Sequence, residues 1–278
     1  MKKILSFFLT ITCLLIIDNT IAQTTGSYRF SYEFTFQRDT NDVNSKMKEL
    51  FVLDVFKDHS SFVSFNKLRN DKYLDSLLKS VESAGGVGSI RSINIRKPGG
   101  SASENVIYKF PDGHLEFQRK ISGGLYGYKE DWHPAWNITD SVATYANYHC
   151  QVATITYGGR NWKAWFTTDI PVQDGPYKFM GLPGLIVRME DDKGQCLYEL
   201  TEVKDFTDGN NSIPKADLVS KNDFIKMVEN GINRPFSAGM AGKTISMKDK
   251  EGNPISMEEM EKRRQDARRK NNNRIELK

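Results

Sequence analysis

The first residues to consider for catalysis are His149 and Cys150, which are adjacent in the chain. A cysteine nucleophile needs a base beside it in space. The surrounding residues have the pattern of a β-strand, in which successive side chains point to opposite faces of the sheet. His149 therefore cannot act as the base for Cys150, and His114 or His133 would have to approach through the fold. A hydrolase that uses Cys150 or a histidine of residues 114–149 is one hypothesis.

A metal site would need histidines or carboxylates at a spacing that brings them together. His59, His114 and His133 show no H-x-x-H or H-E-x-x-H pattern. Glu190-Asp-Asp192 is acidic, but a calcium loop needs more oxygen ligands in a fixed pattern. We interpret the histidines as solvated turn and loop residues and the acidic run as a hairpin tip. We expect no metal and no other cofactor.

Four tryptophans could form a binding surface or part of the core. Ligand pockets are mostly aromatic with a few polar groups, so an aromatic-rich sheet could hold an apolar or sugar-like ligand. Ordinary core packing explains the same residues. Arg160 and Lys178 could meet an anionic ligand or pair with Asp169 and Glu190 inside the fold, and for Arg160 we favour the pairing. The candidate binding residues are Trp132, Trp136, Arg160, Trp162, Trp165, Tyr177 and Lys178.

Turn residues and apolar residues alternate in one stretch around which the chain is organised. Leu182-Pro-Gly-Leu185 predicts a type II turn, because proline presets φ at its second position and glycine supplies a positive φ at its third. Leu185-Ile-Val187 then has the pattern of a buried strand. We interpret the stretch as an architectural corner between β segments. The residues of this structural motif are Gly175, Pro176, Gly181, Leu182, Pro183, Gly184, Leu185 and Ile186.

The same stretch carries a resemblance to a known family. Gly181-Leu-Pro-Gly-Leu-Ile186 resembles the signature of the GLPGLI family, a group of secreted proteins from Bacteroidota. The chain is also similar to this family at Tyr148-His-Cys-Gln-Val-Ala-Thr154, Gly159-Arg160, Ala164-Trp-Phe-Thr167, Ile170-Pro171, Gly175-Pro-Tyr-Lys-Phe179 and Asn271-Asn-Asn-Arg-Ile-Glu-Leu277, where Arg274 replaces the usual proline. The resemblance covers roughly residues 26–278. The family has no established activity, so the resemblance implies no mechanism.

Residues 1–22 have the features of a signal peptide. Two lysines precede an apolar run that is too short for a comfortable membrane span, and Thr20-Ile-Ala22 offers small residues for cleavage. We therefore expect an exported protein, in the periplasm or at the cell surface of a Gram-negative bacterium, with no later membrane span. The formal net charge of +4 does not indicate a nucleic-acid partner.

Two cysteines, Cys150 and Cys196, remain after cleavage. An even pair in an exported chain favours a disulfide, and both lie in predicted strands that could be neighbours. The alternative is two separate buried thiols, because geometry decides whether a bridge can form.

Periodicity places the remaining elements. Aromatic residues at every second position of residues 28–37 predict a strand with one apolar face. Leucines at helical spacing predict a helix near 71–84, capped by Asn70 or Asp71. Further strands are predicted at 51–55, 62–65, 106–110, 115–117, 125–129, 148–157, 162–168, 185–190 and 195–203, helices at 221–230 and after Ser256, a polar loop at 38–47, and a Gly-rich insertion at 85–103.

These elements predict an α+β fold, mainly antiparallel β: a curved meander sheet with a helix near 71–84 and C-terminal helices. The domains would be the signal peptide, a β-rich unit at 23–218 and a helical, basic and polar segment at 219–278. We expect an exported envelope protein that binds a ligand or partner through its aromatic-rich sheet or its Gly175–Gly184 loop, without catalysis. Besides the hydrolase, the alternative is an accessory factor of an outer-membrane system that binds an outer-membrane protein through the C-terminal helix.

Overall fold

The computed structural model describes residues 27–83, 103–205, 211–233, 247–248 and 253–276. The predicted signal peptide and nearly all of the predicted Gly-rich insertion lie outside these residues. Among the described residues, no helix combines the length and the apolar character needed to cross a membrane.

One large sheet forms the body of the protein, and it confirms the predicted α+β, mainly antiparallel fold. Its twelve strands follow the order β12-β6-β5-β4-β3-β2-β1-β11-β10-β9-β8-β7. All the pairings are antiparallel except that of β12 with β6. The strands are β1 (Tyr28–Asp39), β2 (Asp42–Val55), β3 (Ser60–Ser64), β4 (Val106–Lys109), β5 (His114–Ile121), β6 (Gly124–Asp131), β7 (Asn137–Tyr145), β8 (Tyr148–Tyr157), β9 (Arg160–Thr167), β10 (Leu185–Asp191), β11 (Cys196–Asp205) and β12 (Asp217–Leu218).

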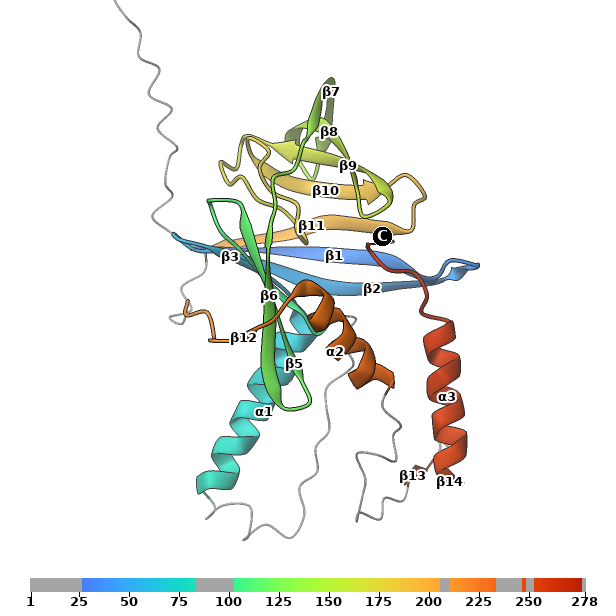
Figure 1. Ribbon diagram of the computed structural model, residues 1–278. Coiled ribbons are helices and arrows are strands. Elements are labelled where there is room, and N and C mark those ends of the chain that lie inside the picture. Colours follow the sequence, from blue (N-terminus) through green and yellow to red (C-terminus); the bar gives the residue numbers. More distant parts are fainter. Residues whose placement is uncertain (1–26, 84–102, 206–210, 234–246, 249–252, 277–278) are drawn as a thin grey trace, which may run out of the picture.

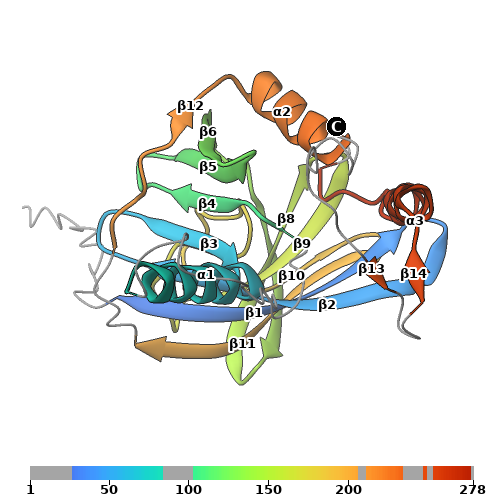
Figure 2. The ribbon, with the colours of Figure 1, turned by 90° about the horizontal axis from the view of Figure 1, so that it is seen from below.

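The sheet is strongly curved, so that β5 and β6 run across the direction of β1 and β2 (Figure 1; Figure 2 shows the curve from below). In the described residues three helices accompany it: α1 (Phe65–Ser83), α2 (Lys221–Asn233) and α3 (Met257–Arg269). Helix α1 contacts β2 and β3, and α2 contacts β5 and β6. A short pair of strands, β13 (Met247–Lys248) and β14 (Pro254–Ile255), precedes α3.

The loop between β9 and β10, residues 168–184, fills the inside of the curve. Phe179 at its centre is completely buried and packs against Trp162 of β9. The buried Lys109 of β4 donates a hydrogen bond to the Gly175 carbonyl at 2.5 Å, and it also pairs with Asp174. Contacts from β4 and β9 thus meet on one loop, which explains why a glycine- and proline-rich segment without regular structure is buried.

Close backbone approach explains the glycines of this loop. A Cβ on Gly184 would lie 2.1 Å from the Thr167 carbonyl oxygen, and one on Gly175 would lie 2.8 Å from Ile186 Cβ. The predicted type II turn is wrong. The Gly184 N–H donates to the Leu182 carbonyl at 2.7 Å, while the Leu185 N–H donates to a different residue, so the bend is a three-residue turn.

The predicted helix near 71–84 is present, but its predicted cap and the predicted loop at 38–47 are wrong and one strand is missed, each for a physical reason. Residues 38–47 are mostly strand, because the β1–β2 hairpin extends beyond the core and exposes both of its faces. Helix α1 begins at Phe65, since the Ser64 hydroxyl accepts the Lys67 N–H and caps the helix earlier than Asn70. Strand β7 was not predicted, because this edge strand is largely exposed and lacks an apolar face.

Candidate functional site

A fully buried ammonium group marks the site. Lys178 Nζ lies 3.0 Å from Glu130 Oε2, 2.6 Å from the Tyr157 hydroxyl and 2.7 Å from Glu276 Oε1. A buried charge is strongly unfavourable unless it is paired and hydrogen-bonded. The three oxygen partners therefore explain how Lys178 can be buried, and they come from three separate parts of the chain.

Each partner is positioned by a different element. Glu130 lies near the end of β6, Tyr157 ends β8, and Glu276 belongs to the segment after α3. Lys178 lies in a turn closed by a 3.1 Å hydrogen bond from the Phe179 N–H to the Pro176 carbonyl. The curved sheet brings β6 and β8 to the same turn, since Glu130 and Tyr157 both contact Lys178.

Tyr177 lies in a strained backbone conformation beside Lys178. Its φ of 56° is in the left-handed region, which bulky residues rarely adopt. The Tyr177 hydroxyl donates to Glu276 Oε1 at 2.5 Å. The strained turn therefore directs two successive side chains, Tyr177 and Lys178, at one carboxylate.

Aromatic rings form the walls of the site. Trp132 packs edge-on against Tyr157, with 4.5 Å between ring centroids, and Lys178 Nζ lies 4.7 Å from the centroid of Phe117. Phe179 contacts Trp136, Tyr157, Trp162 and Tyr177. Trp132 Nε1 is buried without a hydrogen-bond partner in the described part of the chain, which is an unusual state for an indole N–H. The site thus has an unused donor in an apolar wall.

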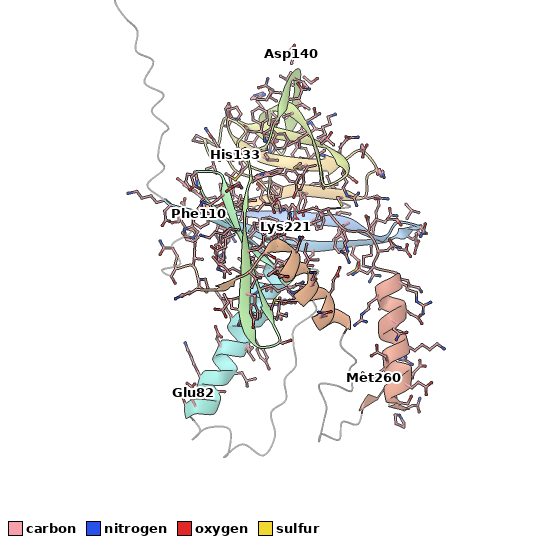
Figure 3. All side chains as sticks on the ribbon, viewed as in Figure 1. Glu82, Phe110, His133, Asp140, Lys221 and Met260 are labelled. Carbon is pink, nitrogen blue, oxygen red and sulfur yellow. The ribbon has the colours of Figure 1, made fainter. Side chains whose placement is uncertain are left out.

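The charges of the site favour a carboxylate at Glu276. Burial raises the pKa of this carboxyl, but the Lys178 charge and the hydrogen bonds from Lys178 and the tyrosines outweigh burial, so that its pKa is lowered. Burial, with the negative charge of Glu276, raises the pKa of Tyr157 and of Tyr177. Both phenols are therefore neutral donors at neutral pH. Lys221, at the start of α2 (Figure 3), adds a second cation 2.9 Å from Glu130 Oε2.

Arg160 holds the segment that carries Glu276. Its buried guanidinium donates to Asp191 at 2.5 Å and to the carbonyls of Arg274 and Ile275 at 2.7 and 3.1 Å. Arg160 does form an ion pair, but with Asp191 and not with the predicted Asp169 or Glu190. The reason is that Arg160 is the first residue of β9 and lies beside the turn that follows Asp191. A guanidinium presents five donors in a fixed plane, which suits a carboxylate and a run of carbonyls together.

Asn273 connects the same segment to the β1–β2 hairpin by hydrogen bonds. Its N–H donates to the Arg38 carbonyl at 3.1 Å, and its side-chain amide donates to the Gln37 carbonyl at 2.7 Å. Residues 271–276, which we call the C-terminal latch, therefore run from the exposed hairpin to Lys178. The latch ends with a carboxylate inside the curve of the sheet.

The structure separates the sequence-predicted site residues into three groups. Trp132, Tyr177 and Lys178 lie at the site. Trp136 and Trp162 form the far side of the site, where both contact Phe179. Their indole N–H groups donate to the Met180 and Tyr157 carbonyls, respectively. Trp165 lies elsewhere: it is on the opposite face of β9 from Trp162 and packs against Lys163 and Arg188.

Sequence reasoning missed Glu130, Tyr157 and Glu276 as site residues. Glu130 and Tyr157 gave no signal, since each looks like an ordinary residue near the end of a strand. Glu276 did give one, because it lies in the Asn271–Leu277 segment that resembles the GLPGLI ending.

The predicted disulfide is wrong. Cys150 and Cys196 are both free and buried. Cys150 is in β8 and Cys196 in β11, and β9 and β10 lie between these strands. Strands are spaced by about 4.8 Å, so the two cysteines are too far apart to bridge. Burial raises the pKa of both thiols, that of Cys196 to about 12.

The histidine candidates lie away from Cys150. The His114 ring stacks on Phe110 and hydrogen-bonds to Asp112 at the β4–β5 turn. His133 lies in the exposed link between β6 and β7 (Figure 3). Within the described ranges, no group of three His, Cys, Asp or Glu side chains is placed to hold a metal ion.

Comparison with known proteins shows a short family match and a similar fold. Residues 158–188, which include Arg160, Lys178 and the loop, match a family described as "Protein of unknown function (Porph_ging)". No curated protein matches the chain.

Two solved structures of PNGF-II, in space groups P21 and C2, are similar to this chain with a TM-score of 0.53 and 10% sequence identity. The similarity covers 74% of this chain but only 34% and 33% of the respective PNGF-II chains, so this chain spans about a third of PNGF-II. At this identity the likeness shows the fold alone.

Proposed function

We propose that this chain is an exported, non-catalytic binding protein of the GLPGLI type, whose Lys178 site takes a carboxylate group. One observation carries the proposal: the buried Lys178 ammonium is closed by Glu276, a carboxylate that the chain supplies from its own C-terminal latch. The latch occupies the site as a ligand would. Its natural competitor would be an acidic small molecule or the acidic segment of a partner.

The chemistry of the site supports binding over catalysis. The two phenols are neutral donors, and the ammonium is fully hydrogen-bonded. Cys150, one of the residues that the hydrolase hypothesis names beside the histidines of 114–149, is buried, and burial raises the pKa of its thiol. Aromatic walls with a few directed polar groups are typical of ligand pockets.

Occupation by the latch sets a condition on any ligand. A segment tethered to its own site competes at an effective concentration in the millimolar range. A ligand must therefore bind strongly, or the latch must be released first. Removing the latch should expose the site to ligands in solution.

The test compares the mature full-length chain with a chain that ends at residue 270. A labelled peptide of residues 270–278 should bind the shortened chain and not the full-length chain in fluorescence anisotropy. Its Glu276→Gln version should bind about tenfold more weakly, since a charge-assisted hydrogen bond is lost. Equal binding of both peptides, or no binding, would refute the carboxylate site.

To identify the ligand, the protein must be purified from the cell in its native state. Both forms should be purified from the periplasm without denaturation and analysed by native mass spectrometry. We expect an acidic small molecule or peptide on the shortened chain and less of it on the full-length chain. An absence of any adduct on either form would count against the proposed function.

The accessory-factor hypothesis concerns α3 and not the Lys178 site. Basic and acidic residues alternate along this helix, which is typical of a solvated surface. If α3 contacts an outer-membrane protein, deletion of residues 256–278 should abolish the co-purification of that protein. A chain truncated only at residue 270 keeps α3 and serves as the control.

A further inference from the structure

A second cavity, of about 330 Å³, contains none of the residues that contact Lys178. It lies where the β5–β6 hairpin meets α2 and α3. Its cationic residues are Arg119, Lys120 and Arg268, and its apolar wall is formed by Ile121, Val228 and Gly231. Three separate elements thus contribute to one hollow. Because successive side chains of a strand point to opposite faces, Arg119 of β5 shares the face of Ile121 and the exposed Lys120 does not, so the guanidinium groups of Arg119 and Arg268 are the cations that the cavity can bring together.

Two acidic residues that lie within two positions of the lining residues Val228 and Arg268 pair with arginines outside the cavity. Glu229 of α2 pairs with Arg274 at 3.6 Å, and Asp266 of α3 pairs with Arg269 at 3.3 Å. Both carboxylates are thereby engaged with other arginines. The cavity keeps an excess of positive charge.

The side chain of Arg268 has an unsatisfied hydrogen-bond donor. Its Nη2 atom is buried and has no hydrogen-bond partner in the part of the chain that the structure describes. A buried polar group is rarely left unsatisfied, and an unpartnered guanidinium is especially unfavourable. Burial also lowers the pKa of Arg119, against the weaker opposing effect of Glu104. Both arginines would gain from an anion in the cavity.

The backbone at the rim is fixed by a tight turn. Ser122 and Gly123 both have positive φ values, 50° and 94°, as in the type I′ turn that joins adjacent antiparallel strands. Ser122 and Lys120 belong to the lining of the cavity and are exposed at its rim. Two guanidinium groups, those of Arg119 and Arg268, are suited to the several oxygens of a tetrahedral anion.

We propose that this cavity binds the phosphate group of a small phosphomonoester. Arginine pairs bind phosphate in a planar, two-pronged manner, which favours a phosphate over a halide ion. The volume lies at the lower end of the range for small-molecule pockets, and it exceeds the space of about 30 Å³ that one water occupies. The organic part of the ligand would lie against Ile121 and Val228.

The ligand would also link α3 to the sheet. Arg119 and Lys120 belong to β5, whereas Arg268 belongs to the last turn of α3. A phosphate held by both elements would fix the helix at the start of the C-terminal latch. This inference does not depend on the proposed carboxylate site.

The test uses the full mature chain with glycerol 3-phosphate, inorganic phosphate and glycerol as probes, at constant ionic strength. Isothermal titration should show binding of the first two and none of glycerol. The Arg268→Gln and Arg119→Gln variants should each raise the Kd about tenfold or more, because each loses a charge-assisted hydrogen bond. The Arg268→Lys variant should show an intermediate Kd.

Lys262→Gln is the matched control, because it removes one positive charge from an exposed position of the same helix that does not line the cavity. It should leave the Kd within about twofold. Circular dichroism checks that every variant is folded. An equal loss in the control and in Arg268→Gln, or no binding of either phosphate by the wild-type chain, would overturn the proposal.

A lipid headgroup is distinguished by co-sedimentation with vesicles of phosphatidylcholine with and without phosphatidate. Binding of phosphatidate vesicles that is lost in Arg268→Gln would support the same site with a lipid as the source. Binding of these vesicles by wild type and Arg268→Gln alike, without binding of glycerol 3-phosphate, would overturn it.

Discussion

At the scale of single residues, Lys178 and Glu276 show how a buried charge makes distant parts of a chain depend on one another. Lys178 is completely buried, so every one of its partners matters to folding. Glu276 is the partner from the chain end, and it is also the one that a ligand carboxylate could replace. The same ion pair therefore supports both stability and the proposed function.

The pH dependence of Glu276 can be predicted in sign. Its pKa is lowered from 4.5 in the folded chain, so the unfolded chain binds more protons near that pH. The stabilisation is complete above about pH 4.5 and is lost as the pH falls through the lower, folded pKa. Urea unfolding at several pH values should show Glu276→Gln less stable by about 1–2 kcal/mol at pH 7. The difference should shrink on acidification; a constant difference would contradict the ion pair.

Gly184 should not tolerate any side chain. The Cβ of Gly184→Ala would meet the Thr167 carbonyl oxygen at 2.1 Å, and we expect a loss of about 3 kcal/mol or more. Gly194→Ala is the control, because it has a positive φ of 62° but open space around it, and it should cost about 1 kcal/mol. Chemical unfolding of both variants measures the difference, and equal losses would show that backbone conformation alone requires Gly184.

The two thiols should be free but unreactive. Cys150 and Cys196 are each 3% exposed, and burial raises both pKa values. In the native chain without residues 1–22, a thiol reagent such as DTNB should therefore label neither cysteine within minutes, and it should label both in urea. Intact mass should be the same with and without reductant. A mass lower by two protons without reductant would restore the disulfide.

At the scale of elements, the loop at 168–184 and the C-terminal latch cover one face of the sheet, as the second sheet does in a β-sandwich. The loop covers the concave face of the sheet, with Phe179 and Leu182 buried at its centre. The latch then closes the edge near Lys178 through Arg160 and Asn273. Both are irregular in secondary structure, and hydrogen bonds to strands fix their positions.

The latch should open when its hydrogen bonds to the β1–β2 hairpin are removed. Asn273→Ala loses the amide bonds to Gln37 and Arg160, so cleavage by trypsin after the exposed Arg274 should accelerate roughly 10- to 30-fold. Asn271→Ala, at an exposed side chain, should cleave at the wild-type rate. Mass spectrometry of the fragments identifies the site. An unchanged rate in Asn273→Ala would show that the contacts of Arg160, Tyr177 and Lys178 hold the latch without Asn273.

At the scale of the whole molecule, one curved sheet supplies nearly all of the core, and the helices lie around it (Figure 2). Deletion of residues 256–278 should therefore leave the sheet folded. We expect an unchanged β-type circular dichroism spectrum and a cooperative transition at a lower urea concentration, because Lys178 and Arg160 lose their latch partners. Loss of the β spectrum would mean that the latch is part of the folding core.

The sequence by itself determined the elements in which apolar residues recur at a regular spacing, and the helix caps. Strand β1, the β4–β5 hairpin and the caps at Ser220 and Ser256 could all be predicted, because alternation and capping act over a few neighbouring residues. The same reasoning failed for β7 and residues 38–47. These segments are stabilised by pairing with a neighbouring strand and bury little apolar surface of their own.

Only the tertiary structure decided which chemical groups meet. Glu130, Tyr157, Lys178 and Glu276 are far apart in the chain, and the curvature of the sheet brings them to one point. Curvature is a sum of small twists and register shifts along many strands, so no local pattern encodes it. For the same reason, the sequence could suggest a bridge between Cys150 and Cys196, but only the strand order could exclude it.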